Sequence, residues 1–205
     1  QNVIRFGPDE DIFLTKLEER KDSLTFETNF LDNAIDLPVT GKYNATNAMI
    51  AAYVALKEGV TQDKIQKAFA TLELTRNRTE WKKAKNGADI LSDVYNANPT
   101  AMRLILETFS TIPFNEKGRK LVVLADMKEL GAYSQKEHQQ LVDDIAAYSW
   151  DTVLLLGDNF YQTQTNFMKF KTLTEINDYL RQHPFSDTFF LIKGSRSMTM
   201  EKIEI

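Results

Sequence analysis

The sequence predicts a protein of the α/β class, in which a mostly parallel sheet is covered by helices. Strand-like and helix-like segments alternate from about residue 79 onward, which is typical of parallel sheets. Two strand-like segments, residues 121–125 and 152–156, are almost entirely apolar, as strands buried on both faces should be. Polar segments of distinct sequence follow the strands, so we expect binding loops along one edge of this sheet.

The first third of the chain has a different pattern. Short strands separated by turns are expected at residues 2–6, 12–17, 23–29 and 34–37. Two helices are expected at residues 44–58 and 61–72, the first of them rich in small residues that allow close packing. Because residues 73–79 are polar and basic, we predict a boundary here between two domains, residues 1–75 and 76–205.

Strands and helices alternate in the second predicted domain. Strands are expected at residues 79–84, 88–93, 120–125, 152–156 and 188–192, with a weak strand at 169–172. Helices are expected at residues 100–111, 134–148 and 174–182, with a short helix near Asn159. Pro99 suits the first position of its helix, where the missing N–H is not needed.

The composition narrows the classes of function. The 205 residues are 42% hydrophobic and 26% charged, which is ordinary for a soluble globular protein. A net charge of −4 gives no basic footprint for nucleic acid, and no apolar run is long enough for a membrane-spanning helix. The absence of Cys and of a signal peptide leads us to expect a cytoplasmic protein, and we also expect a monomer. Two His and no Cys leave little for a transition metal, whereas oxygen-ligated Mg²⁺ stays open.

Two pairs of residues in or near the first predicted domain are candidate nucleotide contacts. Asn44 and Asn47, three positions apart in the first turn of a helix, would offer donors and acceptors of the kind that an adenine edge needs. Asn is also a common helix cap, which is the alternative interpretation. Arg76 and Arg78 could bind phosphate oxygens bidentately, or could belong to a solvated linker.

A third candidate is the polar loop after the strand at residues 88–93. Asp93 ends this strand, where a carboxylate commonly accepts a hydrogen bond from a ribose hydroxyl. The alternative is that Asp93 caps the loop or the next helix. Asn96 and Asn98 follow in the same loop and are candidates for contact with a second substrate.

Two further segments suggest anion binding. Residues 126–131 (DMKELG) place three charges directly after a buried strand, and Lys128 could meet a carboxylate or phosphate, although such charge runs usually lie in solvent. After the last strand, Gly194 would let backbone N–H groups approach an anion, and its neighbours Lys193, Ser195 and Arg196 add donors. The two His residues, His138 and His183, are expected to be structural.

Four segments, in this order, resemble the Mur ligase family: GKYNATN at residues 41–47, DVYNANP at 93–99, DMKELG at 126–131 and KGSR at 193–196. They resemble in particular the members that join D-alanyl-D-alanine to UDP-N-acetylmuramoyl-tripeptide in peptidoglycan precursor synthesis. The resemblance covers essentially the whole chain. Two departures are Tyr43, where the family usually has His, and Ala125, where a Gly usually precedes the Asp-Met pair.

The resemblance implies a Rossmann-like C-terminal domain for the acceptor at residues 76–205, preceded by the last part of the family's central ATPase domain. It implies adenine contacts for Asn44 and Asn47, a phosphate contact for Arg78 and a ribose contact for Asp93. ATP and Mg²⁺ are the implied cofactors, most Mg²⁺ ligands lie upstream of Gln1, and no catalytic residue is expected in this chain. The residues implied to line the D-alanyl-D-alanine side are Asn96, Asn98, Lys128, Lys193, Ser195 and Arg196.

The implied reaction is ATP-dependent amide formation, in which the tripeptide carboxylate is phosphorylated and the amine of the dipeptide then attacks it. The sequence contains neither G-x-x-x-x-G-K-S/T nor G-x-G-x-x-G, so we expect the phosphate loop upstream and no turnover by these residues alone. Their implied partners are the small-molecule substrates and the missing N-terminal and central-domain residues. Two alternatives remain: a non-catalytic nucleotide- or dipeptide-binding module, and a related amide ligase such as folylpolyglutamate synthase, against which YNANP and DMKELG argue.

Overall fold

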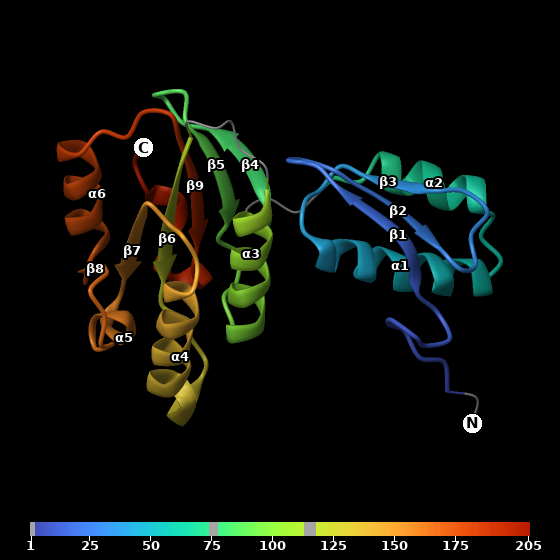
Figure 1. The fold of residues 1–205 in the computed structure, drawn as a ribbon, viewed down its shortest axis with the longest axis horizontal. Coiled ribbons are helices and arrows are strands. Elements are labelled where there is room, and N and C mark those ends of the chain that lie inside the picture. The colour runs from blue at the N-terminus through green and yellow to red at the C-terminus, as the bar shows by residue number, and fades with distance from the viewer. Residues whose placement is uncertain (1–2, 74–77, 113–117) are drawn as a thin grey trace. The chain divides into compact units, whose positions relative to one another are not determined.

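The structure is a computed structural model that describes residues 3–73, 78–112 and 118–205. The chain divides into two compact units, Gln1–Leu74 and Thr75–Ile205 (Figure 1). Each unit has its own sheet and its own hydrophobic core. The two are therefore described one at a time.

The first unit pairs an antiparallel sheet with two helices. Its strands are β1 (Leu14–Glu19), β2 (Leu24–Thr28) and β3 (Ile35–Leu37), in the order β1-β2-β3, and its helices are α1 (Lys42–Lys57) and α2 (Gln62–Ala70). Alternate residues of β2 and β3 point inward, and α1 packs on them through its small residues Ala45, Ala48 and Ala52. The close approach explains why this helix is rich in Ala.

The predicted strand at residues 2–6 is wrong for the residues that the structure describes. Only Phe6 pairs, through an isolated bridge to Ile12 across the turn that begins at Gly7. Val3 is 71% exposed and has no sheet face to cover, so apolar character alone does not make a strand here. The other expected strands of this unit are present with shifted ends.

The second unit is a six-stranded, mostly parallel sheet, which confirms the fold class expected from the sequence. The strand order is β4-β5-β9-β6-β7-β8, and every neighbouring pair is parallel except β4 with β5. A short turn joins β4 to β5 and makes that pair a hairpin. The strands are β4 (Glu80–Lys83), β5 (Asp89–Asp93), β6 (Arg119–Ala125), β7 (Thr152–Leu156), β8 (Met168–Phe170) and β9 (Thr188–Lys193).

Helices cover both faces of this sheet (Figure 1). The helices are α3 (Pro99–Thr111), α4 (Ser134–Ala146), α5 (Asp158–Tyr161) and α6 (Leu173–Gln182), with short 3-10 helices η1 (Gly131–Tyr133), η2 (Arg196–Met198) and η3 (Met200–Lys202). In β6, Val122 and Leu124 face the core beneath α3 and α4, while Leu121 and Val123 face the core beneath α6. This alternation explains why the strand reads as a continuous apolar run.

The strand order brings three carboxyl ends to one place. Because β9 lies between β5 and β6, Asp93 at the end of β5 is level with Lys193, which is itself level with Leu124 near the end of β6. The loop after β5 leads to α3 on one face, whereas the segment after β9 buries Met200 on the other. Open α/β folds bind ligands beyond the carboxyl ends of their strands, at the point where successive connections leave on opposite faces.

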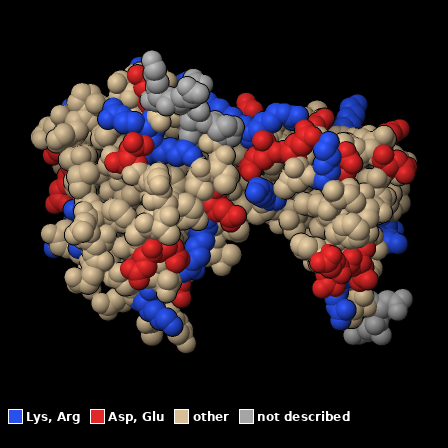
Figure 2. Space-filling view, in the orientation of Figure 1, with Lys and Arg blue, Asp and Glu red and all other residues tan. Residues whose placement is uncertain are grey.

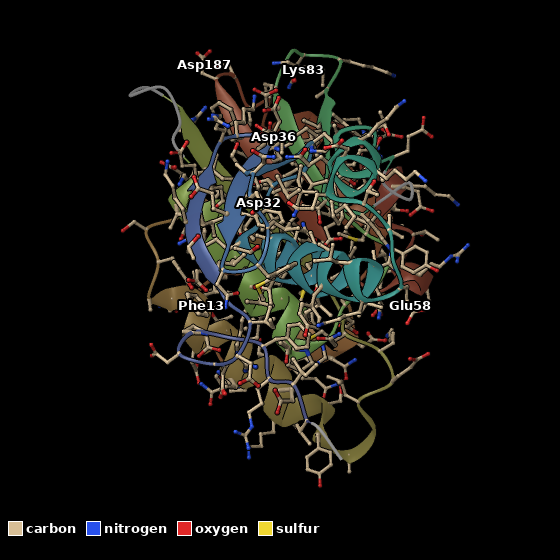
Figure 3. The ribbon with its side chains drawn as sticks, turned by 90° about the vertical axis from the view of Figure 1, so that its right-hand side faces the viewer. Phe13, Asp32, Asp36, Glu58, Lys83 and Asp187 are labelled. Atoms are coloured by element: carbon tan, nitrogen blue, oxygen red, sulfur yellow. The ribbon has the colours of Figure 1, made fainter. Side chains whose placement is uncertain are left out.

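The opposite edge of the sheet is marked in Figure 3 by Lys83 and Asp187, which lie near the amino ends of β5 and β9. Figure 2 shows basic and acidic side chains intermixed on the visible face of each unit, without a large field of one sign. In the part of the chain that the structure describes, no helix is long and apolar enough to cross a membrane.

Candidate ligand site at the carboxyl edge of the sheet

A buried ion pair lies at the centre of the carboxyl edge. The Lys193 ammonium donates to Asp93 Oδ2 at 2.6 Å and to the carbonyl oxygen of Asn96 at 2.9 Å. The side chains are 1% and 15% exposed. Burial lowers the pKa of Lys193, and the Asp93 carboxylate opposes that shift by favouring the charged form. Two residues that the sequence suggested for different substrates are thus direct partners.

Asp93 is not a helix cap in this structure. Its Oδ1 accepts from the backbone N–H of Thr79 at 3.3 Å, so the carboxylate ties the start of the unit to both β5 and β9. Asn98 takes the capping role, since its Oδ1 accepts from the N–H of Ala101 at 2.9 Å, and Pro99 takes the first helical position as expected. A ribose contact by Asp93 stays a prediction.

Lys128 lies beside a second buried carboxylate, that of Asp126. Its Nζ donates to Asp126 Oδ2 at 3.2 Å, and its side chain is 42% exposed. Asp126 also accepts from the backbone N–H groups of Asn159 and Phe160 at 3.1 and 3.0 Å. The buried carboxylate therefore fixes the start of α5, while the half-exposed Lys128 ammonium stays accessible to a ligand.

Ser195 and Gly194 join the last strand to the loop at residues 126–131. The Ser195 hydroxyl accepts from the backbone N–H of Lys128 at 2.9 Å, and the Ser195 N–H donates to the carbonyl of Asp126 at 3.3 Å. A side chain at position 194 would place its Cβ 2.7 Å from Ala125 Cβ. Gly194 thus has a packing reason for being glycine, besides the anion contact that the sequence suggested.

His138 contacts the loop at residues 126–131 through the backbone of Met127. It is fully buried, its Nδ1 lies 2.7 Å from the Ser134 carbonyl oxygen, and its Nε2 lies 3.0 Å from the backbone N of Met127. A carbonyl requires a donor and an N–H requires an acceptor, so the ring is neutral with its proton on Nδ1. The expectation that His138 is structural agrees with this geometry.

Protonation of His138 should destabilise the second unit as the pH falls. Burial lowers the pKa of His138 in the folded protein, so as the pH falls the unfolded chain binds the proton at a higher pH than the folded chain does. The free energy of unfolding therefore decreases below about pH 6.5, by at most ~1.4 kcal/mol per pH unit. We expect urea unfolding between pH 7.5 and 5.5 to show this slope and His138→Gln to remove most of it. The control is His183→Gln, which changes the other, exposed His and should leave the slope in place. An unchanged slope in His138→Gln would contradict the assignment.

Two arginines share one aromatic ring at this edge. The guanidinium carbon of Arg78 lies 4.0 Å from the centroid of the Tyr95 ring, and that of Arg196 lies 5.4 Å from it. Sequence reasoning selected both arginines, and it placed Tyr95 in the polar loop of the DVYNANP motif at the carboxyl end of a strand without giving it a role. Arg76, the other candidate of this segment, lies outside the described residues.

Asn44 lies in the first turn of α1 and Asn47 in the second, in the first unit. The Asn44 side-chain amide donates to the Thr40 carbonyl at 2.6 Å, whereas Asn47 is exposed. Gly41 opens this helix with a φ of +97°, and the ring of Tyr43 packs against it so closely that a Cβ would lie 2.7 Å away. An adenine contact by either Asn stays a prediction.

The described residues do not form a metal centre. Nowhere in residues 3–73, 78–112 and 118–205 do three or more His, Asp or Glu side chains cluster closely enough to hold an ion. The described residues therefore provide no preformed cage of three or more such ligands for Mg²⁺.

The fold defines a doubly wound α/β protein, with a cluster of cationic side chains at the carboxyl edge of its sheet as the candidate ligand site. Residues 77–196 match the family model described as "Mur ligase, glutamate ligase domain". This match covers more than half of the chain, and the chain belongs to the Mur ligase family.

Three similar proteins show how far the likeness extends. The UDP-N-acetylmuramoyl-tripeptide–D-alanyl-D-alanine ligases of Bacillus subtilis and Escherichia coli are 25% and 27% identical, over 96% and 99% of this chain. The crystal structure of MurF from Acinetobacter baumannii superposes with a TM-score of 0.85 at 28% identity, over 97% of this chain and 45% of that chain. This chain spans 45% and 46% of the two curated relatives, which is less than half of their length.

Proposed function

We propose that this chain is part of an ATP-dependent ligase that joins UDP-N-acetylmuramoyl-tripeptide to D-alanyl-D-alanine in peptidoglycan precursor synthesis. The observation that carries the proposal is the carboxyl edge itself. Three of the four motif segments meet there and bring Lys128, Lys193 and Arg196 to one edge of the second unit, and Arg78 joins them over the Tyr95 ring. The names of the similar proteins give the reaction and its substrates.

The two units would have different roles. Residues 1–75 would be the last part of the ATP-binding domain, with Asn44 and Asn47 toward the adenine. Residues 76–205 would bind the acceptor. The hinge that the family resemblance implies near residues 74–78 lies outside the described residues except for Arg78.

The residues of the edge would act by position and charge. ATP, when bound, would supply the phosphoryl group that activates the tripeptide carboxylate. Arg78 and Asp93 would contact the nucleotide, and Lys128, Ser195 and Arg196 would hold the dipeptide carboxylate with Asn96 and Asn98 beside it. Fixed cations at this edge would stabilise the negative charge that develops as the amide forms. These 205 residues alone should neither hydrolyse ATP nor form the amide bond.

The test is amide formation by a polypeptide in which these residues are joined to the upstream part of their own protein. The variants Lys128→Ala and Arg196→Ala should raise the KM for D-alanyl-D-alanine about tenfold and leave the KM for ATP nearly unchanged, since each removes one charged contact to the acceptor. The matched controls are Lys136→Ala on α4 and Arg181→Ala on α6, which remove exposed cations elsewhere in the unit.

The outcomes separate the proposal from its rivals. Wild-type acceptor KM values in both site variants would contradict the site assignment. Binding of nucleotide and dipeptide without amide formation would favour a non-catalytic binding module. Amide formation with a different acceptor, such as glutamate, would favour a related ligase.

A further inference from the structure

Tyr95 is held on a fixed turn at the carboxyl edge. Its neighbours Val94 and Ala97 are each 2% exposed and belong to the cores on opposite faces of the sheet. Lys193 binds the turn on both sides of the tyrosine, through the Asp93 carboxylate and the Asn96 carbonyl. The backbone that carries the ring is therefore anchored at residues 93 and 94 before the tyrosine and at residues 96 and 97 after it.

The two arginines over the ring have anchored backbones as well. The residue after Arg78 is Thr79, whose N–H donates to Asp93, and the residue before Arg196 is Ser195, whose hydroxyl accepts from Lys128. Both guanidinium groups lie within about 6 Å of the ring centroid, where a cation is attracted to the ring face. Long, flexible side chains are thus brought to defined places.

Neither arginine is neutralised by a carboxylate of the described residues. Among the residues that the structure describes, the ion pairs at this edge join Lys193 to Asp93 and Lys128 to Asp126, and none gives Arg78 or Arg196 an acidic partner. The ring attracts a cation through its face, and this attraction does not use up the N–H donors with which a guanidinium binds an oxyanion. Two unneutralised cations on one ring repel each other, and an oxyanion between their donors would relieve that repulsion.

We propose that Tyr95 is a positioning residue that holds Arg78 and Arg196 together for one oxyanion, a phosphate or a carboxylate. The ring restricts two side chains that would otherwise lose much conformational freedom on binding, so it pre-organises the site. The proposal deepens the proposed function and rests on it for the identity of the oxyanion. It adds a second arginine to one of the two contacts assigned above: Arg196 joins Arg78 at a phosphate of the nucleotide, or Arg78 joins Arg196 at the carboxylate of the acceptor.

The test uses the 205-residue chain and three variants. Tyr95→Phe keeps the ring, Tyr95→Leu removes it, and Tyr161→Leu is the matched control. Tyr161 also carries two cations over its ring, Lys171 at 4.6 Å and Lys169 at 5.6 Å, but it lies beside β8 at the other side of the sheet. Two readouts are measured: the NMR shifts of the arginine Nε–H groups, and the affinity for pyrophosphate and, separately, for D-alanyl-D-alanine.

We expect ring-current shifts for Arg78 and Arg196 in the wild type, retained in Tyr95→Phe and lost in Tyr95→Leu. The affinity for whichever probe occupies the site should fall about fivefold to twentyfold in Tyr95→Leu, stay within about twofold in Tyr95→Phe, and be unchanged in Tyr161→Leu. The probe that responds identifies the oxyanion as a phosphate or a carboxylate.

Failure of this proposal differs from failure of the proposed function. Arginine shifts or probe affinities that survive in Tyr95→Leu would overturn the positioning role, and so would a wild type that binds neither probe. If the ring effects are found but the extended protein forms no amide, the ligase function fails while the role of Tyr95 stands.

Discussion

Replacing Asp93 with Ala should destabilise the second unit by about 3–5 kcal/mol, because it leaves the Lys193 ammonium buried without its counter-charge. The lysine side chain is 1% exposed and cannot reach water while β9 stays in the sheet. The same change removes the acceptor for the Thr79 N–H. The measurement is urea unfolding, monitored by tryptophan fluorescence. This signal reports on the second unit because both tryptophans, Trp81 and Trp150, belong to it.

The double variant Asp93→Ala/Lys193→Met separates a lost ion pair from a general loss of packing. Met fills much of the space of the lysine stem without a charge, so the double variant should recover at least ~2 kcal/mol relative to Asp93→Ala. A double variant as unstable as Asp93→Ala would show that the charge is not the cause.

A matched ion pair elsewhere in the sheet provides the control. Lys83 and Asp89 pair at 2.8 Å across β4 and β5, but the lysine side chain is 68% exposed. The variant Asp89→Ala should therefore change the free energy of unfolding by less than about 1 kcal/mol. The two aspartate side chains are similarly buried, at 15% and 14% exposed, so the burial of the lysine that each variant leaves behind decides the difference between them.

Much of this architecture could be predicted from the sequence because its signals are local. The apolar runs of β6 and β7 mark strands buried on both faces, and Pro99 after a polar loop marks the start of α3. The same reasoning placed the candidate site residues at strand ends. It failed at residues 2–6, where apolar side chains have no neighbouring strand to pair with.

The contacts within the site could not be predicted, since they depend on the order of the strands. The insertion of β9 between β5 and β6 pairs residues 93 and 193, which are a hundred positions apart in the chain. Sequence reasoning assigned Asp93 to the nucleotide and Lys193 to the acceptor, and this ion pair joins the two residues. Tyr95 lies in the DVYNANP motif at a strand end, but the motif alone gives this ring no role, and the role proposed for it follows from the arginines that lie over the ring.

The second large effect is expected at Gly157, which joins β7 to α5. Its φ of +118° and ψ of 167° lie in a region that essentially only glycine adopts, and a Cβ there would lie 2.4 Å from the carboxyl carbon of Asp126. Asp126 cannot move away, since it is fully buried and accepts from the N–H groups of Asn159 and Phe160. We expect Gly157→Ala to destabilise the unit by about 3–5 kcal/mol in the same unfolding assay.

The control for backbone strain alone is Gly87→Ala in the turn between β4 and β5. Gly87 has a φ of +86° but nothing within 4 Å of its Cβ position, so Gly87→Ala should lower the free energy of unfolding by only about 1–2 kcal/mol.

The clash at position 157 can be isolated by adding Asp126→Ala to Gly157→Ala, which removes the carboxylate that a Cβ at position 157 would meet. The clash exists only while position 126 carries a carboxylate, so it is absent from the double variant. The double variant should therefore be more stable than the sum of the two single effects predicts. Strict additivity, or equal losses at positions 87 and 157, would show that Asp126 does not restrict Gly157.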